Sequence, residues 1–211
     1  MSGGIPFLDI LIFAIIAIFL GLRLRSVLGR RDGFEQDLRR DPDAVEAMSE
    51  MRTKAKPQDL VSGEGIEAIA NADTSFSEKE FLKGASAAYG MILEAFADGD
   101  METLKPLLGY EMNTGFAQAI RDRGKAGETL SINLASLDDV KIHKARLTDG
   151  VASITVEYRS QQKRILKAED GAIIEGADDA TEAFIDHWTF ERDISSRDPN
   201  WLLVETETLQ D

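Results

Sequence analysis

A continuous apolar run opens the chain and differs from everything that follows it. Residues 5–22 read IPFLDILIFAIIAIFLGL, with Asp9 as the single charge. About 18 helical residues rise roughly 27 Å, which is close to the thickness of a bilayer core. We therefore expect residues 1–31 to form a transmembrane anchor with a basic flank. The side chains expected in the membrane include Ile10, Leu11, Phe13, Ile16, Phe19 and Leu20.

Basic residues lie on only one side of this run. Four arginines follow it closely, namely Arg23, Arg25, Arg30 and Arg31, and no lysine or arginine precedes it. The positive-inside rule then predicts a single-pass protein with its N-terminus outside and its remainder in the cytoplasm. We expect a bacterial inner membrane, because no arginine-rich amphipathic transit peptide precedes the span. A cleaved signal peptide would carry its basic residues before the apolar run, so we favour an uncleaved anchor. The same arginines can contact anionic lipid headgroups such as cardiolipin.

The hydrophobic pattern then becomes sparse over residues 32–71. Apolar residues are scattered there, and Asp41-Pro42, Lys56-Pro57 and Gly63-Glu64-Gly65 interrupt any period. Such a segment buries too little surface to offset the entropy lost on ordering. We expect a flexible tether, with a root-mean-square span of roughly 35 Å.

A helical period begins after residue 72. Ser77 and Glu80 fit a capping box, and Phe76 and Phe81 fit a hydrophobic staple around the same helix start. Apolar residues then recur at helical spacing up to Gly99, a typical helix end. The pattern predicts two further helices, over residues 101–108 and 111–123.

The period changes to two residues after Gly127. Apolar positions alternate over residues 130–134, over 140–142 after a break at Asp138-Asp139, and over 152–158 after a hairpin signal at Asp149-Gly150. Further alternating strands follow up to residue 206. Three helices followed by antiparallel strands predict an α+β domain over residues 72–211, with the helices on one face of a bent sheet.

Charge and composition exclude several functions. The formal net charge of −14 argues against a nucleic-acid partner, whose phosphates require a basic face. The absence of cysteine removes disulfides, thiolate nucleophiles and cysteine–zinc sites. The two histidines, His143 and His187, lie far apart in the sequence, so we expect no metal site. We also expect no cofactor.

Two motifs make the helical and strand halves more specific. Residues 81–100 read FLKGASAAYGMILEAFADGD, and residues 186–203 read DHWTFERDISSRDPNWLL. In this order they resemble the Tim44-like family, over roughly residues 66–208. The namesake of that family is the peripheral subunit of the mitochondrial inner-membrane translocase that anchors a seventy-kilodalton heat-shock chaperone.

The resemblance implies a cone-shaped fold of the nuclear-transport-factor-two type, membrane association, and a role in protein translocation or membrane-protein assembly. The namesake has a longer N-terminal region that holds the chaperone and the channel, whereas this chain has a span and a short tether there. We therefore expect a non-enzymatic adaptor that binds a translocation or assembly partner, anionic lipid, or both. Whether it recruits a chaperone, which partner or lipid it binds and its oligomeric state all stay open at this point.

An alternative function uses the interior of the cone to bind a lipid or small molecule, with or without an enzymatic reaction on it. The candidate residues for a pocket or core are Tyr89, Asp186, Trp188, Phe190, Arg192 and Trp201. Strand alternation favours core positions for the aromatic residues. A structural ion pair with Asp186 or Asp198 is favoured for Arg192, because a buried unpaired charge is costly.

Two other functions remain as weaker alternatives. One alternative is an enzyme that uses Asp186 as a catalytic acid in an apolar pocket, as ketosteroid isomerases do. No second acid or nucleophile is placed to help Asp186. We therefore expect no catalytic residue. A ribosome-to-membrane tether is disfavoured by the acidity of the chain.

Overall fold

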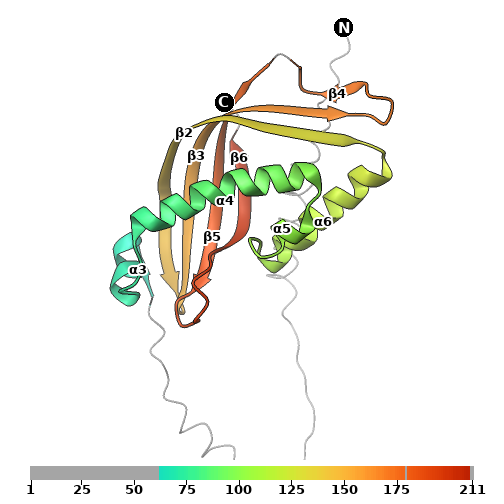
Figure 1. Cartoon of the computed structure of the whole chain (residues 1–211). Helices are drawn as coiled ribbons and strands as arrows, with labels where there is room; N and C mark the ends of the chain where they lie inside the picture. Colours follow the sequence, from blue (N-terminus) through green and yellow to red (C-terminus); the bar gives the residue numbers. More distant parts are fainter. Residues whose placement is uncertain (1–61, 179, 210–211) are drawn as a thin grey trace, which may run out of the picture. The chain divides into compact units, whose positions relative to one another are not determined.

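A computed structural model describes residues 62–178 and 180–209 (Figure 1). They form an α+β domain in which a long helix crosses the concave face of a curved antiparallel sheet. This agrees with the fold class expected from the sequence. The predicted anchor over residues 1–31 and the predicted tether up to residue 61 lie outside this part of the chain. Within the described ranges, no helix has the length and apolar character needed to cross a membrane.

The long helix, α4 (Glu78–Asp98), begins and ends where the sequence predicts. The Ser77 side chain accepts a hydrogen bond from the backbone N–H of Glu80, and the rings of Phe76 and Phe81 lie 6.1 Å apart. Gly99 ends the helix in the left-handed conformation, at φ 73°. The Ser77 half of the capping box, the staple and the Gly99 stop are therefore confirmed, and the buried face of α4 points toward the sheet.

Two shorter helices follow, and the first is shorter than predicted. Helix α5 (Met101–Leu104) stops before Pro106, which has no N–H to continue the helical ladder. The chain instead bonds to the last strand: the N–H of Leu203 donates to the Leu107 carbonyl at 2.8 Å. Helix α6 (Tyr110–Lys125) then runs close to the predicted span.

The sheet has the order β1-β2-β3-β5-β6, with β4 paired to β3, and β1 is the short edge strand Gly63–Glu64. Its main strands are β2 (Thr129–Thr148), β3 (Val151–Lys167), β4 (Ile173–Glu175), β5 (Glu182–Asp193) and β6 (Leu202–Leu209). The hairpin prediction at Asp149-Gly150 is confirmed, because both residues have positive φ, as a tight hairpin turn requires.

The break predicted at Asp138-Asp139 is not a strand end. Strand β2 continues through it with a register shift against β3, and two more shifts lie between Leu134 and Ser136 and between Ile142 and Lys144. An extra residue on one strand of a pair bends that strand. These irregularities accompany the curvature with which the sheet wraps around α4 (Figure 1).

The ordered domain begins earlier than the expected boundary at residue 72. Strand β1 (Gly63–Glu64) pairs with β2, and helix α3 (Ile66–Ala72) follows it. The N–H of Gly65 donates to the Ala145 carbonyl at 2.9 Å, and the Ile69 side chain is completely buried. A seven-residue helix shows little period in the sequence, and burial of Ile69 against the rest of the domain stabilises it.

Candidate functional site

Four of the candidate residues alternate along β5. Asp186, Trp188, Phe190 and Arg192 share the face that meets α4, as strand alternation predicts. They separate into a polar cluster around Asp186 and an aromatic cluster around Phe190. Tyr89 joins the first cluster and Trp201 joins the second.

The Asp186 carboxylate is 2% exposed and receives two hydroxyl donors. Tyr89 of α4 donates to Oδ2 at 2.5 Å, and Thr208 of β6 donates to Oδ1 at 2.5 Å. Arg164 Nη2 lies 3.9 Å from Oδ2 and supplies the compensating charge. Gln162 Nε2 donates to the Tyr89 hydroxyl at 2.7 Å, which links the cluster to β3. The buried charge is therefore paired and hydrogen-bonded from several segments.

Aromatic packing fixes the tyrosine that makes this network. The ring of Tyr89 stacks on Tyr158 at 4.3 Å and tilts against Trp188 at 4.6 Å. Burial, together with the neighbouring Asp186 charge, raises the pKa of Tyr89 well above its usual value. Burial also raises the pKa of Tyr158, whose hydroxyl donates to the Ala85 carbonyl at 3.0 Å. Both hydroxyls therefore stay protonated and act as donors at neutral pH.

The second cluster lies where α4 begins. Phe81 contacts Phe190 and Trp201 edge-on, with ring centroids 6.1 and 4.8 Å apart, and Phe76 reaches Trp201 at 6.0 Å. Phe81 and Phe190 are buried, and Trp201 is partly buried. These residues close the core between the helix start and the last strand.

The expected partner of Arg192 is wrong. Neither Asp186 nor Asp198 pairs with it; its guanidinium bonds to the carboxylate of Asp73, just after α3, and lies 5.1 Å from the Trp201 ring. The wrong partner was expected because residues 66–71 of α3 were assigned to the tether. Asp73 then lay at the very start of the predicted domain and was not considered as a partner of a residue in the sheet. The expectation of a structural ion pair itself is confirmed.

Asp73 is held as a carboxylate by these contacts. Burial raises the pKa of Asp73. Hydrogen bonds from Ser75, together with the charge and hydrogen bond of Arg192, lower it by a larger amount, so the net shift of the pKa is downward. The pair therefore joins the segment after α3 to β5 at neutral pH.

The family follows from a match over most of the chain. Residues 62–208 match the model of the Tim44-like domain. The chain belongs to the Tim44-like family. A search of curated proteins found no match.

Solved structures include one similar to the Tim44-like domain of this chain. It is the intermembrane space region of the chloroplast protein ARC6, at 16% sequence identity and a TM-score of 0.43. The similarity covers 62% of this chain and 97% of that structure.

The sequence analysis did not identify the polar residues that contact Tyr89 and Asp186 inside the Tim44-like domain. Ser160 and Gln162 continue the inward alternation of residues 152–158, but with polar side chains, and both are fully buried. Polar residues at inward positions of a strand are a signal for a buried network. Arg164 is the next polar residue of the same alternation, whereas Thr208 carried no comparable local signal.

The polar groups around Asp186 form hydrogen bonds with one another. Both oxygens of Asp186 already accept hydrogen bonds from hydroxyl groups, and the Tyr89 hydroxyl is bonded in turn to Ser160 and Gln162. In this structure Asp186 and Tyr89 hold α4, β5 and β6 together.

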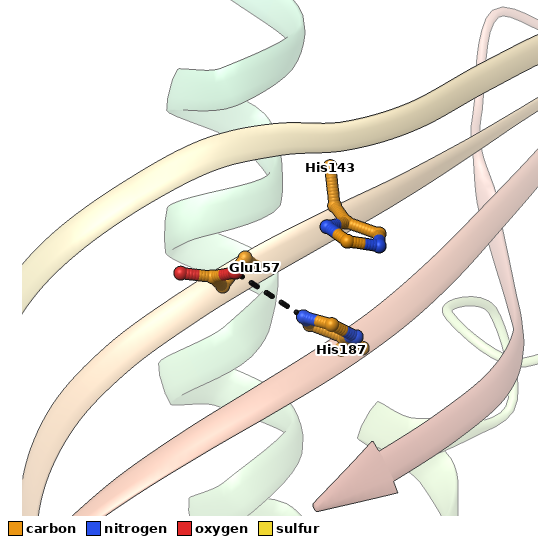
Figure 2. Close-up of side chains that lie close together, drawn as sticks. All are labelled: His143, Glu157 and His187. Carbon is orange, nitrogen blue, oxygen red and sulfur yellow. Dashed lines mark hydrogen bonds and ion pairs between the residues drawn. The ribbon is translucent and has the colours of Figure 1, made fainter. Parts of the chain in front are cut away.

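The opposite face of the sheet contradicts one premise of the sequence analysis. His143 and His187 were judged too far apart in sequence to share a site, yet their rings stack at 4.3 Å, beside Glu157 (Figure 2). Antiparallel pairing of β2, β3 and β5 brings these distant positions together. His187 Nε2 lies 3.3 Å from Glu157 Oε2, and Lys141 and Arg159 contact Glu157 Oε1 at 2.9 and 3.0 Å.

Proposed function

We propose that this Tim44-like protein is a membrane-anchored, non-enzymatic adaptor in protein translocation or inner-membrane protein assembly. The observation that carries the proposal is family membership across residues 62–208, behind an apolar run and an arginine cluster that suit a single membrane span. The domain would face the cytoplasm of a bacterial cell and adopt the cone of the nuclear-transport-factor-two type. The flanking arginines would contact anionic lipid, and the domain would bind a protein partner.

The interior of the domain supports docking in preference to catalysis. The concave face around Asp186 is occupied by Tyr89, Tyr158 and Trp188, all of them buried. The polar groups there bond to one another and are buried, so a partner would bind the domain on its outer surfaces. The candidate lipid or small-molecule site at Asp186 would require these side chains to separate.

Several large apolar side chains are available on the outside. Tyr110, the first residue of α6, is 87% exposed, and Met91 on α4 is about half exposed. Exposed aromatic residues are common contact residues in protein interfaces. Tyr110 is therefore a well-placed position for a crosslinking probe.

Site-specific photocrosslinking in intact cells tests the adaptor function. A photoreactive phenylalanine analogue in place of Tyr110, in the full-length chain, is expected to trap a component of the translocation or membrane-protein assembly machinery. The same analogue in place of the exposed Lys144, on the opposite face of the sheet, serves as the control position. Adducts from neither position, or the same set of soluble proteins from both, would contradict the proposal.

A further inference from the structure

The outer face of the sheet gathers both histidines of the chain around one carboxylate. His143 lies on β2, Glu157 on β3 and His187 on β5, and one potential ligand atom from each lies within 4.8 Å of the other two (Figure 2). We propose that His143, Glu157 and His187 form a binding site for a divalent transition-metal ion of the zinc type. The site lies on the face opposite α4 and is independent of the adaptor function.

The strand register explains how the three side chains meet. Glu157 pairs directly with His187 on one side and with Lys141 on the other. Ile142 pairs with Val156 and Lys144 pairs with Thr155, which are consecutive residues of β3. His143 is therefore an extra residue of β2 that has no partner in this register. Such an extra residue re-aims its side chain. Here the His143 ring lies beside the His187 ring, with Glu157 next to them (Figure 2).

The donor set has the chemistry that this class of metal prefers. Two imidazole nitrogens and a carboxylate oxygen are common ligands of zinc and its neighbours. Two ligands bound about 2.1 Å from a tetrahedral zinc ion lie about 3.4 Å apart. The 3.3 Å between His187 Nε2 and Glu157 Oε2 already has this spacing. Rotation of the exposed His143 side chain completes a three-ligand site, with water at the remaining position.

The neighbours of Glu157 prepare its carboxylate. Lys141 and Arg159 both bind Oε1, so Oε2 faces the histidines. Hydrogen bonds of this kind orient a metal ligand from behind. The two cations also repel a dication, so we expect weaker binding than at a three-histidine site.

Isothermal titration of the full-length protein with Zn²⁺ tests the site. The protein is purified in detergent without a histidine tag, and excess Mg²⁺ is present because the acidic chain has many carboxylates that bind hard cations weakly. NMR of the histidine rings follows the same titration, since the chain has only two histidines. Four proteins are compared: the wild type, His143→Ala, His187→Gln, and the matched control Lys144→Ala from the neighbouring exposed position.

The expected result is saturable binding of one Zn²⁺ per chain, with both imidazole signals shifting together. His143→Ala should weaken binding by at least ~10-fold, because it removes one of three ligands, while Lys144→Ala should leave the affinity within about two-fold of wild type. His143 is exposed, so its loss is not expected to disturb folding, and a second variant, His187→Gln, should weaken binding in the same way. Unchanged affinity in His143→Ala, or histidine signals that do not respond to Zn²⁺, would overturn the proposal.

Discussion

The Asp186 carboxylate receives groups from segments that are distant in the sequence. Tyr89 of α4, Thr208 of β6 and Arg164 of β3 converge on it, and each must be in place for its negative charge to be compensated. Buried polar networks of this kind favour one packing arrangement when every member is satisfied. The network therefore specifies how α4 sits on the sheet.

Replacing Tyr89 by phenylalanine tests this network. Tyr89→Phe removes the hydroxyl donor to Asp186 and leaves one carboxylate oxygen without that hydrogen bond in a buried site. We expect the free energy of unfolding to fall by about 2 kcal/mol, measured by urea denaturation. The matched control is Tyr110→Phe, since Tyr110 is exposed, and it should change stability by less than about 0.5 kcal/mol. Equal effects of the two changes would contradict the role given to the network.

The Asp73–Arg192 pair makes part of the stability depend on pH. The folded-state pKa of Asp73 lies below the usual value for an aspartate, so its stabilising contribution is present above that usual value and is lost as the pH falls through the lower folded-state pKa. Asp73→Asn lacks this contribution. The difference in unfolding free energy between wild type and variant should be largest near neutral pH and shrink below about pH 4. Denaturation curves at a series of pH values measure it, and a difference that grows on acidification would be the opposite of what the ion pair predicts.

The turn between β2 and β3 contributes through its backbone conformation. Gly150 has φ 80°, where an L-residue is strained, but a Cβ added there would meet no atom within 4 Å. Gly150→Ala should therefore lower the free energy of unfolding by about 1 kcal/mol through strain alone.

A second glycine gives a matched comparison of opposite sign. Gly84 lies on the exposed face of α4, and an added Cβ is equally free of contacts. Gly84→Ala should raise the free energy of unfolding by about 0.5–1 kcal/mol, because alanine loses less backbone entropy in a helix. Thermal melts of the two variants decide the point, and shifts of the melting temperature in the same direction would rule out a conformational origin.

Local signals explain why α4 and the β2–β3 hairpin were predictable. The Ser77 cap, the Gly99 stop and the Asp149-Gly150 turn act within a few residues, so the sequence displays them directly. The Asp138-Asp139 irregularity was visible too, but its meaning depended on whether the pairing with β3 resumed beyond it.

Partners distant in the sequence could not be derived in the same way. Asp73 meets Arg192 across 119 positions, and His143 meets His187 through the register of three strands. Helix α3 depends on burial of Ile69 in a core that local patterning does not reveal. Strand alternation was enough to put Asp186, Trp188, Phe190 and Arg192 on one face of β5, whereas the groups that bond to Asp186 and Arg192 required the structure.

The whole chain combines an acidic domain with an apolar segment over residues 5–22. Deleting residues 1–31 removes that segment and leaves the matched family region intact. We expect the shortened chain to move from the membrane fraction to the soluble fraction while its thermal unfolding transition is retained, because about 18 apolar residues supply the membrane affinity. Fractionation after alkaline extraction measures this. Full-length chain in the soluble fraction would remove the basis for an anchored adaptor.

The position of β1 has a mechanical consequence. Gly63–Glu64 is a two-residue edge strand, and it is followed at once by the Gly65 hydrogen bond to Ala145 and by the completely buried Ile69. A pulling force transmitted from the preceding chain would load the hydrogen bond from the Asp149 N–H to Ser62 Oγ first, and these contacts directly after it. The hydrogen bonds between β1 and β2 can break one at a time, whereas removing the Ile69 side chain from the core exposes its whole apolar surface to water. The domain would then yield first at α3, and the sheet from β2 to β6 would stay closed under a modest load.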